Sequence, residues 1–110
     1  LQGRYSGGKM FKEFVQEYLA YSKTNKAPKT YEEDVYILRK FQEFIPNKRL
    51  PEIRPKDLED YKATLTEKNL SPVSVNNYLR VIKASLNLAQ KWGYLDKSPG
   101  QVVKFLHYSN

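Results

Sequence analysis

Residues 70–99, LSPVSVNNYLRVIKASLNLAQKWGYLDKSP, decide the fold because they predict one long helix with a defined start and end. Ser71 is a favoured N-cap residue, and Pro72 suits the first helical position, where its missing N–H has no helical partner. Gly93 stands where a left-handed residue commonly ends a helix. Apolar side chains recur at helical spacing between these signals. The predicted inward stripe consists of Val75, Tyr78, Leu79, Ile82, Leu86, Ala89 and Trp92.

Charge is distributed unevenly along the chain. No acidic residue lies between Ser71 and Trp92, whereas residues 1–67 hold 13 Lys/Arg and 11 Asp/Glu. Residues 68–110 hold six Lys/Arg and a single acid, Asp96, so most of the net charge of +7 lies there. Such asymmetry favours an acidic partner, either nucleic acid or an anionic membrane. Nucleic acid is the partner that we expect, because amides and cations share the exposed side of the helix.

Composition limits the classes of protein that this chain can represent. The 110 residues suffice for one domain with one hydrophobic core, and 40% hydrophobic residues indicate a globular chain. The absence of cysteine excludes disulfides and thiolate metal sites and favours an intracellular, cytoplasmic setting. No apolar run approaches the roughly 20 residues that span a bilayer, so we expect no membrane partner.

Three further helices are predicted over residues 10–26, 29–45 and 55–68 by apolar side chains at helical spacing. For the second of these, the predicted buried face is Val35, Leu38, Phe41, Phe44 and Ile45. A last short helix is predicted after Ser98 and Pro99, containing Val102, Val103 and Leu106. Because no segment alternates with period two, we expect an all-α fold, a compact bundle of four main helices plus a short C-terminal helix.

The sequence contains no constellation suited to catalysis. Its single histidine, His107, lies three residues from the chain end, and no glycine-rich phosphate loop is present. The acidic run Glu32-Glu33-Asp34 does not predict a metal site, because adjacent residues on a helix point in different directions; favourable charge near a helix N-terminus explains it. We therefore expect no enzymatic activity in this chain, no metal, no cofactor and no small-molecule substrate.

Four segments, in order, resemble the N-terminal core-binding domain of tyrosine recombinases, the SAM-like domain of phage integrases. They are FKEFVQEYLAYSK, KAPKTYEEDVYILRKF, LPEIRPKDLEDY and the stretch that opens this section, and together they cover about residues 10–100. Three positions differ from the family pattern. Asp34 stands where a tyrosine is common, Arg54 where a small capping residue is usual, and Ser98 where asparagine often precedes the proline.

The resemblance implies a division of labour. In such recombinases this domain clamps one face of the DNA, while a C-terminal domain carries the catalytic residues. The expected partners are double-stranded DNA and the catalytic domain of the same parent chain, and the isolated domain is expected to be a monomer. The expected organisation is a flexible leader or cloning remnant over residues 1–9, the DNA-binding domain over 10–107, and the start of a linker over 108–110.

The second and fourth helices face the duplex in this family, which selects candidate DNA contacts. Asparagine can pair with adenine and arginine with guanine, whereas serine at a helix N-terminus suits a phosphate. The fourth helix contributes Ser71, Ser74, Asn76, Asn77, Arg80 and Lys83. The first turn of the second helix contributes Lys29, Thr30 and Tyr31, and a turn contributes Lys48 and Arg49 as sequence-independent phosphate contacts.

Two other functions stay open at this level. A helix-turn-helix regulator would use residues 68–70 as the turn before the reading helix, and it predicts a dimer on a palindromic site. A helical protein-interaction module would instead expose an apolar groove.

Overall fold

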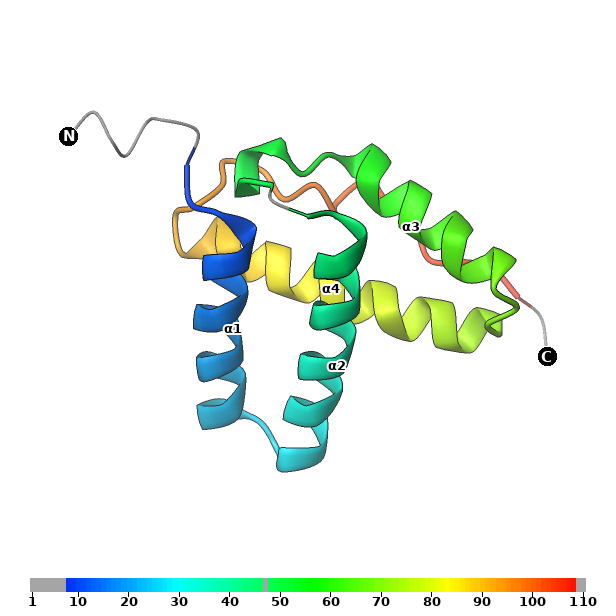
Figure 1. The fold of residues 1–110 in the computed structure, drawn as a ribbon, viewed down its shortest axis with the longest axis horizontal. Helices are drawn as coiled ribbons and strands as arrows, with labels where there is room; N and C mark the ends of the chain where they lie inside the picture. The colour runs from blue at the N-terminus through cyan, green and yellow to red at the C-terminus, as the bar shows by residue number, and fades with distance from the viewer. Residues whose placement is uncertain (1–7, 47, 109–110) are drawn as a thin grey trace.

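The computed structural model describes residues 8–46 and 48–108 and places four α-helices there, with no β-strand in those ranges (Figure 1). The helices are α1 (Phe11–Asn25), α2 (Pro28–Phe44), α3 (Pro55–Glu67) and α4 (Pro72–Lys91), and a 3₁₀ turn, η2 (Leu50–Glu52), precedes α3. The predicted all-α fold with four main helices is confirmed. Most of the predicted leader, residues 1–7, and the linker residues 109–110 lie outside the described residues.

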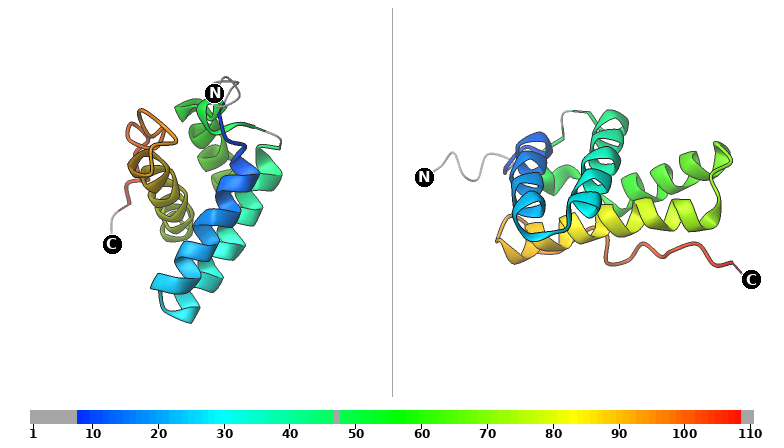
Figure 2. Two further views of the ribbon diagram at one scale, coloured as in Figure 1. Left: turned by 90° about the vertical axis from the view of Figure 1, so that its left-hand side faces the viewer. Right: turned by 90° about the horizontal axis from the view of Figure 1, so that it is seen from below.

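The helices pack as a hairpin crossed by a long helix. α1 and α2 run antiparallel to each other, α4 passes behind both, and α3 folds back beside the first half of α4 (Figures 1 and 2). One hydrophobic core joins them, with Phe14, Leu38, Leu58 and Leu79 fully buried. No helix of the described part is both long enough and apolar enough to cross a membrane.

Both predicted ends of α4 are confirmed. The Ser71 hydroxyl accepts a hydrogen bond from the Ser74 amide at 3.2 Å, which satisfies an N–H that lacks a helical partner. At the other end Gly93 has φ +88°, and the Tyr94 amide reaches back to the Ala89 carbonyl at 2.9 Å. This is the left-handed closure that glycine permits at no steric cost.

The predicted buried faces need four corrections, the first at Tyr78 of α4, which is only half-buried. On α2, Ile37 is buried and Val35 is only half-buried, because Val35 lies on the side of the helix that lines a surface hollow with Glu32 and Arg39. Phe44 is 36% exposed, since its ring lies on the outer side of Tyr61. Trp92, at the C-cap of α4, is 40% exposed and stacks edge-on against Phe14 instead of entering the core.

The predicted short C-terminal helix is wrong. After a turn at 99–102, residues 103–108, hereafter the C-terminal segment, run extended back along α4 (Figure 2). Asn76 bonds both backbone groups of Leu106, at 2.7 and 3.0 Å, and Lys62 donates to the Lys104 carbonyl at 2.7 Å. Lys83 donates to the Val103 carbonyl. These side chains satisfy backbone groups that a helix would pair internally. Val103 is buried although it is not part of a helix.

Two tyrosines make the fold sensitive to alkali. Burial raises the pKa of Tyr61 to about 12, and burial together with the Tyr36 hydroxyl raises the pKa of Tyr78 to about 12. An unfolded chain deprotonates its tyrosines near 10, so between pH 10 and 12 the folded state binds more protons. We expect the free energy of unfolding to fall across that window, which urea denaturation at pH 9 and 11 measures. Tyr61→Phe should show a smaller fall, and an equal fall would contradict this assignment.

Candidate nucleic-acid interface

An open groove of about 540 Å³ follows the first half of α4. Four residues predicted from the sequence meet there, and the ring of Phe105 in the C-terminal segment forms one wall. The groove is lined by Val73, Ser74, Asn76, Asn77, Tyr78, Arg80 and Phe105. Ser71 lies at the N-terminal end of the same helix as its cap. Hydroxyl, amide and guanidinium groups thus gather on a helix that carries no acid of its own.

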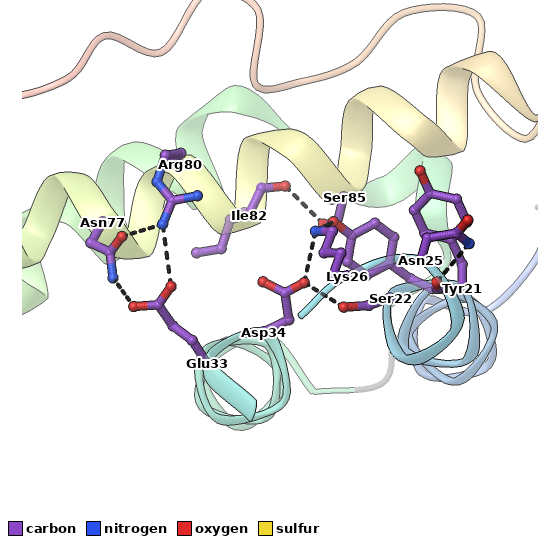
Figure 3. A network of polar contacts seen from close by, with 11 residues as sticks. Tyr21, Ser22, Asn25, Lys26, Glu33, Asp34, Asn77, Arg80, Ile82 and Ser85 are labelled. Atoms are coloured by element: carbon purple, nitrogen blue, oxygen red, sulfur yellow. Dashed lines mark hydrogen bonds and ion pairs between the residues drawn. The ribbon is translucent and has the colours of Figure 1, made fainter. Parts of the chain in front are cut away.

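Glu33 of α2 reaches this face and joins two of the predicted residues (Figure 3). Its carboxylate accepts a hydrogen bond from Asn77 Nδ2 at 2.6 Å and one from Arg80 Nη2 at 3.2 Å. The same Arg80 nitrogen donates to Asn77 Oδ1, so the three side chains close a ring. We call Glu33, Asn77 and Arg80 the interhelix cluster.

Glu33 was not among the residues predicted from the sequence for the interface. The acidic run was explained as charge near a helix N-terminus, and three adjacent acids do not show which one faces another helix. A usable signal did exist, because Glu33 precedes the buried Ile37 and Phe41 by four and eight residues and so shares their side of α2. That spacing places its carboxylate on the buried side of α2, and the structure shows that α4 is the helix it meets there.

Two predicted contacts of α4 are engaged by the C-terminal segment. Asn76 uses both its amide oxygen and its amide nitrogen on Leu106, and it is half-buried. The Lys83 ammonium donates to the Val103 carbonyl and lies 4.4 Å from the centre of the Phe105 ring. In this structure both side chains therefore hold the segment against α4.

The remaining predicted residues lie at the two ends of α2, away from the groove. Lys29 is exposed in the first turn, where Thr30 and Tyr31 are half-buried. Lys48 and Arg49 follow the opposite end. Lys48 pairs with Asp57 at 3.1 Å, and the Arg49 guanidinium donates to the Gly8 carbonyl at 2.9 Å. The structure does not bring these five residues together with the groove.

Asp34 is a buried structural group that is 2% exposed. Its Oδ2 accepts hydrogen bonds from Ser22 Oγ and from Lys26 Nζ, each at 2.8 Å (Figure 3). The Lys26 ammonium also donates to the Tyr18 hydroxyl at 3.0 Å. Burial alone would lower the pKa of Lys26, but the bonds to Asp34 and Tyr18 outweigh burial and raise that pKa above its ordinary value. This ion pair therefore ties α1 to α2.

The three consecutive acids serve different neighbours. Glu32 lines a separate hollow of about 280 Å³ with Tyr36 and Arg39, Glu33 reaches α4, and Asp34 faces α1. Within residues 8–46 and 48–108 no three His, Cys, Asp or Glu side chains gather in a way that could hold a metal ion.

Comparison with protein families gives a match over most of the chain. The family model described as the phage integrase SAM-like domain matches residues 10–105. A search among curated proteins finds no match.

Solved structures with the same fold include three from integrases. The integrase-like domain from Bacillus cereus superposes with a TM-score of 0.84 at 14% identity, covering 93% of this chain and 87% of that one. The N-terminal domain of a phage integrase/site-specific recombinase from Haloarcula marismortui gives 0.78 at 19%, covering 90% and 98%. Lambda integrase, solved as a dimer bound to a COC' core site, gives 0.84 at 9% identity. That match covers 99% of this chain but 31% of the lambda chain.

Proposed function

The chain belongs to the phage integrase SAM-like domain family, and from this premise we propose that it is the DNA-binding module of a site-specific tyrosine recombinase. The observation that carries the proposal is the groove on α4, where Ser74, Asn77 and Arg80 present donors on a helix without acidic residues. A polyanion with hydrogen-bonding base edges is the ligand that such a surface fits. The lambda integrase structure, which holds a core site, supports DNA as the partner.

The proposed contacts fall into two groups. Arg80 and Asn77 face base edges, while Ser71 and Ser74 at the helix N-terminus bind a phosphate. Lys29, Thr30 and Tyr31 in the first turn of α2 and the loop cations Lys48 and Arg49 contact the backbone of the duplex. Asn76 and Lys83 can contact DNA only if the C-terminal segment moves away from α4, because both side chains bond that segment.

We propose that another domain of the parent protein carries the residues that catalyse recombination. This chain corresponds to the SAM-like region of integrases, and it spans about a third of lambda integrase, 31% of that chain. We propose residues 10–107 as the DNA-binding domain of the parent, with 108–110 beginning the connection to its catalytic domain. DNA integration or recombination is then the activity of the parent, and this module holds one face of the site.

Binding to duplex DNA should be steeply salt-dependent and should require Arg80. The logarithm of affinity is expected to fall by about 0.9 per phosphate contact for each decade of salt. Arg80→Ala should weaken binding to a duplex enriched from a random pool by about 1–3 kcal/mol. The matched control is Lys91→Ala, which removes an exposed cation from the far end of the same helix. Fluorescence anisotropy measures both effects, and a flat salt response or an unchanged Arg80→Ala affinity would contradict the proposal.

The two alternative functions predict different outcomes in solution. Addition of a short duplex should perturb amide NMR signals of residues 71–80 and 29–31, whereas a protein-interaction module would show no such localised change. A helix-turn-helix regulator would sediment as a dimer, and the family match favours the integrase module over it.

A further inference from the structure

Glu33 places a negative charge on the face of α4 that is proposed to meet DNA. A carboxylate beside the approaching phosphates opposes binding by like-charge repulsion. Its oxygens nevertheless contact the two side chains best suited to read bases, Asn77 at 2.6 Å and Arg80 at 3.2 Å. An acid in this position weakens general attraction to DNA, so its role must lie in how it arranges its partners.

The geometry of the interhelix cluster fixes both partners. Asn77 donates through Nδ2 to Glu33 and accepts through Oδ1 from Arg80, which determines the orientation of its amide. Both bonds of Arg80 within the cluster use Nη2, so Nε and Nη1 are the donors that the cluster leaves unused, on a side chain that is 56% exposed. Because Glu33 belongs to α2, the guanidinium of Arg80 is aligned by the packing of two helices.

We propose that Glu33 is a positioning residue that gives the module sequence selectivity: it holds Arg80 in one orientation for a base edge, while its charge weakens binding to every duplex, so that only a matching base offsets the repulsion. The inference rests on the proposed DNA-binding function. With Nη2 engaged, Arg80 can meet a base acceptor through a single hydrogen bond from Nε or Nη1, and such a bond needs the guanidinium in a defined position. An arginine released from its carboxylate can donate hydrogen bonds to any backbone phosphate, and such contacts raise the affinity for all sequences alike.

The test compares Glu33→Gln with Glu32→Gln in the 110-residue chain. Glu32 has the same charge and lies one residue away, but it lines the separate hollow beside Tyr36 and Arg39. Two quantities are measured: affinity for a random-sequence 20-base-pair duplex at 150 mM salt, and the sequence enrichment obtained by selection from a random pool. Glu33→Gln should raise the random-duplex affinity by about fivefold and flatten the selected consensus. Glu32→Gln should change that affinity by less than about twofold, since Glu32 lines the separate hollow and makes no bond to Asn77 or Arg80.

A double-mutant cycle separates positioning from a general charge effect. In an Arg80→Ala background, Glu33→Gln should no longer alter the consensus, because the side chain it orients is gone. Equal behaviour of the two glutamine variants, or a consensus that stays sharp in Glu33→Gln, would overturn the inference while leaving DNA binding intact. Failure of the unaltered chain to bind any duplex would overturn both proposals. Thermal unfolding of each variant, expected within a few degrees of the parent, confirms that the comparison is between folded proteins.

Discussion

Asp34→Ala is expected to lower the free energy of unfolding by about 3 kcal/mol, because removing one partner of a buried ion pair leaves the other charge without compensation. The carboxylate is 2% exposed and accepts bonds from Lys26 and Ser22, both at 2.8 Å. Without it the Ser22 hydroxyl, which is fully buried, loses its acceptor, and the half-buried Lys26 ammonium keeps only the Tyr18 hydroxyl. Urea denaturation at pH 7 measures the loss.

Asp60→Ala is the matched control for this substitution. Asp60 also pairs with a lysine, Lys56, at 2.6 Å, but on the exposed face of α3. Solvent-exposed pairs one helical turn apart contribute about 0.3–0.5 kcal/mol. A loss in Asp34→Ala as small as that in Asp60→Ala would contradict the role assigned to the buried pair.

Phe41→Ala is expected to cost about 4 kcal/mol, within the range for deleting a buried aromatic ring. Phe41 is 0% exposed, and its ring meets Phe11 edge-on at 5.7 Å and Tyr61 at 5.2 Å between ring centres. It therefore joins α1, α2 and α3 at one point, and its removal leaves a cavity that three helices would have to close together. Denaturant unfolding followed by circular dichroism measures the loss.

Phe44→Ala tests whether burial determines that cost. Phe44 lies almost one turn further along α2 and also packs on Tyr61, at 4.8 Å between ring centres, but it is 36% exposed. Its removal opens the surface instead of leaving a closed cavity, and we expect a loss of about 1 kcal/mol. Similar losses for the two variants would show that the core does not centre on Phe41.

The sequence was sufficient for features that depend on neighbours along the chain. Ser71, Pro72 and Gly93 fix the ends of α4 through local backbone chemistry, and helical spacing finds the core side chains that lie near the middle of each stripe. The sequence was not sufficient to predict which side chains at the edges of those apolar stripes are buried. The burial of Ile37 depends on how the other helices pack on α2, and the exposure of Phe44 depends on its packing against Tyr61 of α3, neither of which a local pattern states.

Long-range polar pairing could be predicted only in part, because helical spacing places Glu33 on the side of Ile37 and Phe41 but does not identify the helix that it bonds. Glu33 and Asp34 are adjacent acids of similar local context, yet one bonds α4 and the other bonds α1, because consecutive side chains diverge around the helix. The C-terminal segment was misassigned for a related reason. Its apolar residues are compatible with either a short helix or an extended segment. The extended path depends on Asn76, which lies thirty residues before its partner Leu106.

The way in which the C-terminal segment is held has a consequence for how its sequence can vary in evolution. Its carbonyls are bound by side chains of Lys62, Asn76 and Lys83, and the Lys104 side chain takes no part in the bond that its own carbonyl accepts. The path of the segment is therefore encoded in α3 and α4. Lys104 can be replaced by other residue types while that path is kept. A substitution of Asn76, in contrast, would change the path although no residue of the segment itself is altered.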